Sequence, residues 1–174
     1  MMIDTKKKIH FIGIGGIGMS AIANVLHKLG FEISGSDIQE NVITKTLKKE
    51  GIKIYYSHSG QNLVNVDLVV YSSAIKKNNL EFKFAISNKI QIISRATMLA
   101  EVMRLKSSIT VAGSHGKTTT TSLISVILES SGMDPTIING GIINQFNANS
   151  KLGKGDWLVA EADESDGSFV FLPS

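Results

Sequence analysis

Residues 9–30 have the sequence IHFIGIGGIGMSAIANVLHKLG, and this stretch decides the fold class. Ile9 to Ile12 form a short apolar run that ends in glycines, which is typical of a buried parallel strand. From Ser20 to Leu29 the apolar residues fall on one helical face, and Gly30 is a helix stop. A buried strand, a glycine turn and a helix in this order predict an α/β protein with a parallel sheet.

The same alternation continues along the chain. Further strands are expected at 31–34, 52–56, 67–71 and 91–93, and helices at 42–49, 80–87 and 97–104. Because the pattern contains no tight hairpin turns, right-handed crossovers should join these strands into a doubly wound sheet. We therefore predict a Rossmann-like domain over residues 1–105.

The pattern restarts after residue 105. It predicts a strand at 108–112, a glycine-rich turn, a helix at 118–131, an extended segment at 136–138, a turn at 139–141 and a strand at 156–160. This order is expected of the first part of a P-loop nucleotide-binding α/β domain over residues 106–174. Three strands and one helix cannot close such a domain, so we expect the sequence to be a fragment.

Composition excludes several classes of protein. Apolar residues make up 43% and charged residues 19% of 174 residues, with a net charge of +3 and 6% aromatics. These values favour a soluble domain and do not favour nucleic-acid or membrane binding. The polar start, Met1 to Lys8, lacks the apolar run of a signal peptide, so a cytoplasmic location is expected.

Metal binding by cysteine or histidine is not predicted. The chain has no cysteine, which excludes a disulfide framework and a thiolate metal site. His10, His27 and His58 are scattered, and no metal-ligand spacing links them.

The first phosphate-binding candidate is the glycine loop at residues 13–18, which has the pattern GxGxxG. Gly15, Gly16, Ile17 and Gly18 let backbone amides approach a diphosphate at the start of a helix. Asp37 follows the second predicted strand, about 20 residues after the last glycine, where a carboxylate can meet a ribose hydroxyl. The motif alone leaves open which diphosphate is bound.

The second candidate has the sequence GSHGKTT at residues 113–119. Its backbone amides would hold the phosphates of a nucleoside triphosphate, Lys117 would lie along the β- and γ-phosphates, and Thr118 would hold Mg²⁺. Val111 stands where the common P-loop pattern has its first glycine, so the loop is a tighter form. His115 is interpreted as a loop residue and not as a base.

An acidic cluster follows the last predicted strand, at residues 161–166. Such clusters are often solvated turns, but a carboxylate at the end of a strand beside a phosphate loop faces the bound metal. Glu161 is the residue best placed for that.

Six segments together resemble the Mur ligase family. They are GIGGIGMS (13–20), GSD (35–37), SSAI (72–75), SRATMLAE (94–101), AGSHGKTTT (112–120) and EADESDGSF (161–169). The glycine loop and GKT are generic, whereas their order together with ADESDGSF is specific. Ser114 stands where relatives commonly have threonine, which leaves the backbone cradle intact.

The resemblance implies a substrate for each loop. Gly15 to Gly18 would face the diphosphate of UDP-N-acetylmuramate, with Asp37 on the uridine side, Ser72 and Ser73 at the same crevice, and Arg95 near the substrate charge. Residues 113–119 (Gly113, Ser114, His115, Gly116, Lys117, Thr118 and Thr119) would bind ATP, and Thr118 and Glu161 would hold Mg²⁺.

The implied activity is ATP-dependent joining of L-alanine to the sugar nucleotide in peptidoglycan synthesis. Lys117 and Glu161 would act in phosphoryl transfer, and an acyl phosphate would be the intermediate. A separate amino-acid-binding domain would be missing from this sequence. We expect the chain to bind the UDP-sugar and to lack ligase activity by itself.

Three alternatives remain open. An NAD-dependent dehydrogenase would account for the glycine loop and Asp37, although it has no use for GKT. A non-catalytic nucleotide-binding module would account for the short chain. A related ligase that attaches a recycled peptide to the same sugar nucleotide would share most of the motifs.

Overall fold

The computed structural model describes residues 7–162. The chain divides into two compact units, Met1–Arg95 and Ala96–Ser174. This division lies ten residues before the domain boundary predicted from the sequence, because α4 (Arg95–Met103) falls almost wholly in the second unit. Within residues 7–162, no helix is long and apolar enough to cross a membrane.

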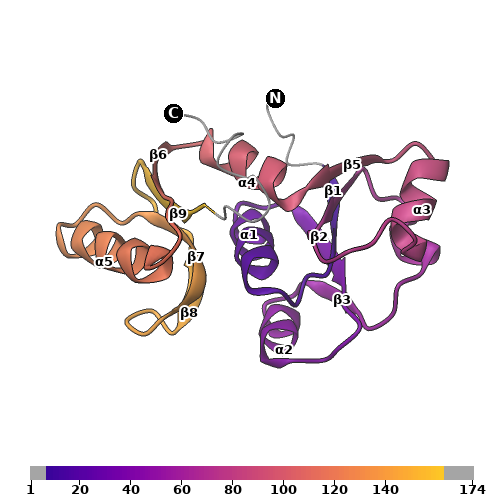
Figure 1. Cartoon of the computed structure of the whole chain (residues 1–174), viewed down its shortest axis with the longest axis horizontal. Coiled ribbons are helices and arrows are strands. Elements are labelled where there is room, and N and C mark those ends of the chain that lie inside the picture. Colours follow the sequence, from indigo (N-terminus) through magenta and orange to yellow (C-terminus); the bar gives the residue numbers. More distant parts are fainter. Residues whose placement is uncertain (1–6, 163–174) are drawn as a thin grey trace. The chain divides into compact units, whose positions relative to one another are not determined.

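The first unit contains the parallel sheet that the sequence predicts, and the structure gives its five strands the order β3-β2-β1-β4-β5 (Figure 1). Figure 1 shows α1 and α2 on one face of this sheet and α3 on the other. The elements are β1 (Lys8–Ile12), α1 (Ile17–Lys28), β2 (Glu32–Ser36), α2 (Val42–Lys49), β3 (Lys53–Tyr55), the 3₁₀ helix η1 (Gly60–Leu63), β4 (Leu68–Tyr71), α3 (Leu80–Ser87) and β5 (Gln91–Ser94).

Strand β1 is the central strand of the sheet, and its apolar side chains are fully buried. Ile9, Phe11 and Ile12 have no exposed surface, as expected for a strand covered by helices on both faces. Eight consecutive residues of α1, from Met19 to Leu26, are buried, so this helix packs over much of its circumference. Gly30, with a φ of +96°, ends the helical segment in a left-handed conformation that favours glycine.

The second unit contains a four-stranded sheet in the order β6-β9-β7-β8. Its elements after α4 are β6 (Ser107–Val111), α5 (Lys117–Ser130), β7 (Thr136–Ile143), β8 (Ala148–Lys151) and β9 (Trp157–Glu161). Strand β9 pairs in parallel with both β6 and β7, whereas β8 pairs antiparallel with β7.

The sequence-based prediction was wrong at residues 139–141, which were expected to form a turn. Asn139, Gly140 and Gly141 lie inside β7, and β7 and β8 form an antiparallel pair that the sequence did not predict. Glycine pairs usually mark turns, but here they permit a close approach to a neighbouring segment. The ladder is irregular between Ile138 and Ile143, which is where the glycines lie.

Candidate functional site

The first glycine loop joins β1 to α1 at the carboxyl edge of the five-stranded sheet. Gly13 has a φ of +83°, and Gly16 is the N-cap of α1 with no side-chain cap. Ile17, the first residue of the helix, is 43% exposed. Because β2 lies on one side of β1 and β4 on the other, the loop is at the switch point where open α/β sheets bind ligands.

Asp37 holds this loop in place. The Gly15 N–H donates to Asp37 Oδ2 at 2.9 Å, and Asn41 Nδ2 donates to the Gly15 carbonyl at 3.3 Å. A Cβ at Gly15 would lie 2.7 Å from Asp37 Oδ2, so a side chain there would displace the carboxylate. Asp37 Oδ1 accepts the N–H of Gln39 at 3.2 Å. The carboxylate therefore orders the loop, and its contact with a ribose stays a prediction.

Arg95 and Ser72 lie beside the same loop. A Cβ at Gly18 would be 2.6 Å from Arg95 Nη1, and a Cβ at Gly13 would be 3.5 Å from Ser72 Oγ. Ser73 follows with an exposed side chain. The structure thus places a guanidinium and a hydroxyl beside the glycine loop at the start of α1.

The second glycine loop joins β6 to α5. Gly116 is the N-cap of α5 with a φ of +77°, and Gly113 has a φ of +147°. Ser114 and His115 are exposed between them. The Lys117 ammonium donates to the Gly113 carbonyl at 2.6 Å, so it lies over the loop. A cation held there faces the space in which phosphate oxygens of a P-loop ligand lie.

Thr118 and Glu161, the two predicted metal ligands, lie side by side. The Thr118 hydroxyl oxygen is 3.0 Å from Glu161 Oε2 and 3.2 Å from Oε1. Strand pairing causes this, because Glu161 ends β9 in register with Val111 of β6, directly before the loop. Hydroxyl and carboxylate oxygens are ligands that Mg²⁺ accepts, so the pair fits this ion. Residues 163–166 of the acidic cluster lie outside the described residues.

Gly140 and Gly141 were missed as site residues. The Gly140 N–H donates to Glu161 Oε2 at 2.9 Å, and a Cβ there would lie 2.5 Å from the same oxygen. A Cβ at Gly141 would lie 2.9 Å from Thr118 Cγ2. The glycine pair therefore lets β7 approach both predicted metal ligands. The Gly-Gly sequence was the available signal, but it favoured a turn.

A hollow of about 350 Å³ adjoins this second loop. Thr118, Thr119 and Ser122 line it from α5, Ile142 lines it from the end of β7, and Asn144 follows that strand. Leu123 of α5 also lines it and is 59% exposed. The hollow provides a mixed polar and apolar surface next to the Thr118 hydroxyl.

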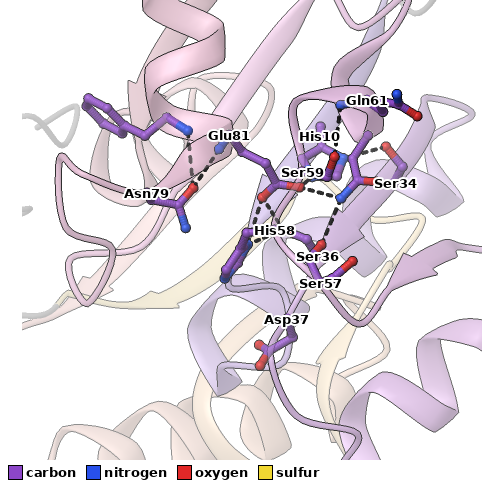
Figure 2. A network of polar contacts seen from close by, with 12 residues as sticks. His10, Ser34, Ser36, Asp37, Ser57, His58, Ser59, Gln61, Asn79 and Glu81 are labelled. Carbon is purple, nitrogen blue, oxygen red and sulfur yellow. Dashed lines mark hydrogen bonds and ion pairs between the residues drawn. The ribbon is translucent and has the colours of Figure 1, made fainter.

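A buried polar cluster in the first unit was also missed (Figure 2). His10 and His58, which are far apart in sequence, both lie within 3.4 Å of the Glu81 carboxylate. The signal would have been an acidic residue in an otherwise apolar helix, but sequence cannot show which segments meet it. Within residues 7–162, no group of three or more His, Cys, Asp or Glu side chains is arranged to hold a metal.

Comparison with known proteins identifies the family of the chain. The family model "Mur ligase family, catalytic domain" matches residues 8–107. The chain belongs to the Mur ligase family. The chain is 58% identical over 171 residues to a UDP-N-acetylmuramate–L-alanine ligase of Rickettsia bellii, and 53% identical over 166 residues to one of Methylobacterium nodulans. These alignments cover 98% and 95% of the chain but 36% and 35% of the relatives.

Solved Mur ligase structures have the same fold. The UDP-N-acetylmuramate–alanine ligase of Thermotoga maritima superimposes with a TM-score of 0.86 at 37% identity, over 91% of this chain and 37% of that one. A Neisseria UDP-N-acetylmuramate:L-alanyl-γ-D-glutamyl-meso-diaminopimelate ligase gives a TM-score of 0.86 at 30% identity, over 92% and 54%. This Mur ligase chain therefore spans about a third of the length of the curated relatives it matches.

Proposed function

We propose that this chain is part of an ATP-dependent ligase that joins L-alanine to the lactyl carboxylate of UDP-N-acetylmuramate in peptidoglycan synthesis. The observation that carries the proposal is the presence of two strand–loop–helix sites in one chain, one of which places Thr118 against Glu161. A dehydrogenase needs only the first of these sites. Relatives that are 53–59% identical are named as ligases of this kind.

Each loop is assigned one substrate. The first loop, with Asp37, Arg95 and Ser72 around it, would bind the diphosphate of the UDP-sugar, and residues 1–105 would form that domain. The second loop would bind ATP, and residues 106–174 would belong to the ATP-binding domain. Thr118 and Glu161 would hold Mg²⁺, which when bound supplies positive charge beside the phosphates. We place the reaction in the cytoplasm, where ATP and nucleotide sugars are available.

The chemistry requires activation of a carboxylate. Its oxygen attacks the γ-phosphorus of ATP, ADP leaves, and the product is an acyl phosphate. The amine of L-alanine then attacks the acyl carbon, the C–O bond to phosphate breaks, inorganic phosphate leaves, and the amine loses a proton. Lys117 lies where its ammonium would offset charge on the transferring phosphoryl group.

A related ligase that attaches a preformed peptide is the second candidate, because the Neisseria peptide ligase has the same fold as the chain. Both activities use the same sugar nucleotide and the same phosphoryl transfer. Comparison of L-alanine with the L-alanyl-γ-D-glutamyl peptide as acceptor in the complete enzyme separates them. Preferential turnover of the peptide would contradict the assignment of L-alanine.

The direct test of the first loop is calorimetric titration of the chain with UDP-N-acetylmuramate, NADH and ATP. We expect the UDP-sugar to bind and NADH not to compete with it. Binding of NADH in place of the UDP-sugar would contradict the proposal in favour of a dehydrogenase. Detection of ADP release by the complete enzyme, dependent on the amino acid, distinguishes a ligase from a non-catalytic nucleotide-binding module.

A further inference from the structure

Glu81 is a carboxylate buried beneath the start of α3. Its side chain has no exposed surface. Asn79 caps the helix by accepting the N–H of Glu81 at 2.9 Å and of Phe82 at 3.2 Å. A glutamate in the first turn of a helix would ordinarily extend into water, where it also favours the helix dipole. Burial of a carboxylate costs free energy unless the group is hydrogen-bonded or paired with a charge, so Glu81 requires polar partners.

Four side chains from other segments surround this carboxylate (Figure 2). The Ser36 hydroxyl donates to Oε2 at 2.5 Å, and His58 Nδ1 lies 2.8 Å from the same oxygen. Asn62 Nδ2 donates to Oε1 at 2.6 Å, and His10 Nε2 lies 3.4 Å from Oε1. Glu81 therefore ties α3 to β1, to the end of β2 and to the segment that includes η1.

The environment keeps Glu81 ionised. Burial by itself raises the pKa of this carboxyl group, but the contact with His10 and the hydrogen bonds from Ser36 and Asn62 outweigh burial and lower the pKa to about 2. Because it is ionised at neutral pH, the Glu81 carboxylate is a strong acceptor for the Ser36 hydroxyl.

Ser36 connects this cluster to the first glycine loop. It is the last residue of β2, and its carbonyl accepts the N–H of Gly13 at 2.8 Å and of Ile14 at 3.0 Å. The next residue, Asp37, accepts the N–H of Gly15. Three consecutive loop amides are thus held by two adjacent residues, and the side chain of the first of them is anchored on Glu81.

We propose that Glu81 is a positioning residue for the sugar-nucleotide site: through Ser36 it fixes the end of β2 and thereby the orientation of the Gly13–Gly15 amides. This inference rests on the proposed function of the first loop. The physical reason is that Ser36 makes two contacts at once. Its hydroxyl is bonded to Glu81, and this bond limits the movement of its carbonyl, which accepts the loop N–H groups. Loss of the anchor gives the loop freedom that a bound diphosphate would have to remove.

Substitution of two serines of β2 distinguishes positioning of the loop by Glu81 from general stabilisation of the strand. Ser34 and Ser36 both lie in β2 and both belong to the cluster, but the Ser34 hydroxyl is 2.9 Å from His10 Nδ1 and not bonded to Glu81. Ser34→Ala is therefore the matched control for Ser36→Ala. Glu81→Gln has the same shape as the native side chain but lacks the charge.

The test measures UDP-N-acetylmuramate affinity by calorimetry and amide exchange by NMR in the 174-residue chain and in the three variants. We expect Ser36→Ala to weaken binding about tenfold and Glu81→Gln to weaken it further, since removing hydrogen bonds to a charged acceptor has effects of this size. Ser34→Ala should stay within about twofold of the wild type. In Ser36→Ala without ligand, the Gly13–Gly15 amides should exchange faster while the β4 amides do not.

Several results would overturn the inference. Unchanged affinity and unchanged loop exchange in Ser36→Ala would show that the cluster is only structural. Equal weakening by Ser34→Ala would show general loosening of β2. If Glu81→Gln does not fold, Ser36→Ala decides by itself. Failure of the wild-type chain to bind the UDP-sugar would contradict the proposed function, whereas the loop-exchange result would still decide whether Glu81 orders the loop.

Discussion

The two glycine loops have the same strand–loop–helix form but are supported in different ways. The first loop is held from outside, because Ser36 at the end of β2, the following residue Asp37 and the α2 N-cap Asn41 bond to its backbone. In the second loop the Lys117 side chain bonds to the carbonyl of Gly113 in the same loop. The backbone of the first loop is thus bonded by residues distant in sequence. In the second loop Lys117 bonds to the loop backbone, and the contact with a distant residue is the side-chain pair of Thr118 and Glu161.

The helices that follow the two loops differ in how many of their residues are buried. Helix α1 buries eight of its twelve residues, whereas Thr121 and Ser125 are the two buried residues among the fourteen of α5. Leu123 and Ile127 of α5 are 59% and 63% exposed. A similar local sequence pattern therefore gives helices of very different burial, because burial depends on how many elements surround them.

The largest expected effect concerns the second loop. Lys117→Ala and Glu161→Ala in the complete enzyme should each reduce kcat by about 100-fold or more, about 3 kcal/mol, because each removes a charge beside the transferring phosphoryl group. KM for the UDP-sugar should stay near its normal value if the two loops act separately. Steady-state assays of phosphate release check this. Near-normal turnover in either variant would remove that residue from the mechanism.

The next effect concerns acid stability of the first unit. The folded-state pKa of Glu81 is about 2, below its ordinary value of 4.5, so its contribution is present above pH 4.5 and is lost as the pH falls toward 2. It amounts to at most about 3 kcal/mol. Asp134 of the second unit also has a lowered pKa, through its bond from Lys151, but its side chain is 39% exposed and should matter less.

Acid unfolding followed by NMR resolves the two units. Signals of the first unit should be lost with falling pH in this window, and Glu81→Gln should flatten that dependence. Asp134→Asn is the control, and it should leave the first unit unaffected. Equal acid sensitivity of Glu81→Gln and the wild type would contradict the assignment.

A smaller effect is expected at Gly16 in the first loop. A Cβ there would meet the Gly13 carbonyl only at 3.5 Å and Met19 Cγ at 4.0 Å, so Gly16→Ala should fold normally. The alanine side chain would nevertheless block the close approach of a diphosphate to the backbone, and the larger side chain of Gly16→Val would block it more strongly. We expect UDP-N-acetylmuramate affinity to fall by about 2 kcal/mol in calorimetry. Unchanged affinity of Gly16→Val would show that this loop does not bind the sugar nucleotide.

The smallest effect is expected at Gly140 beside the second loop. The Cβ of Gly140→Ala would force Glu161 Oε2 to move, which should weaken Mg²⁺-dependent ATP binding in the complete enzyme by about 1 kcal/mol. Ile127→Ala, which changes an exposed residue of α5 that does not line the hollow, is the control. Equal effects of the two substitutions on ATP binding would contradict a specific contribution of Gly140.

The sequence by itself determined the α/β class, the alternation of strands and helices along the first unit and the positions of both glycine loops. These features are local: apolar runs, helical periodicity and glycines at strand ends reflect backbone sterics and burial within short segments. It also indicated Lys117, Thr118 and Glu161, since a carboxylate at a strand end beside a P-loop is a pattern of position along the chain. The family resemblance was confirmed by the matching family model.

Only the tertiary structure decided which distant residues meet. Gly140 and Gly141 predicted a turn because local conformation favours one, yet they lie in β7 beyond its pairing with β9 and lie close to Glu161 and Thr118. His10 and His58 have no meaningful spacing in sequence. They meet at Glu81 because the tertiary fold brings together β1, the segment after β3 and the helix after β4. Hydrogen bonds between segments tens of residues apart are set by sheet order and packing, which no local pattern encodes.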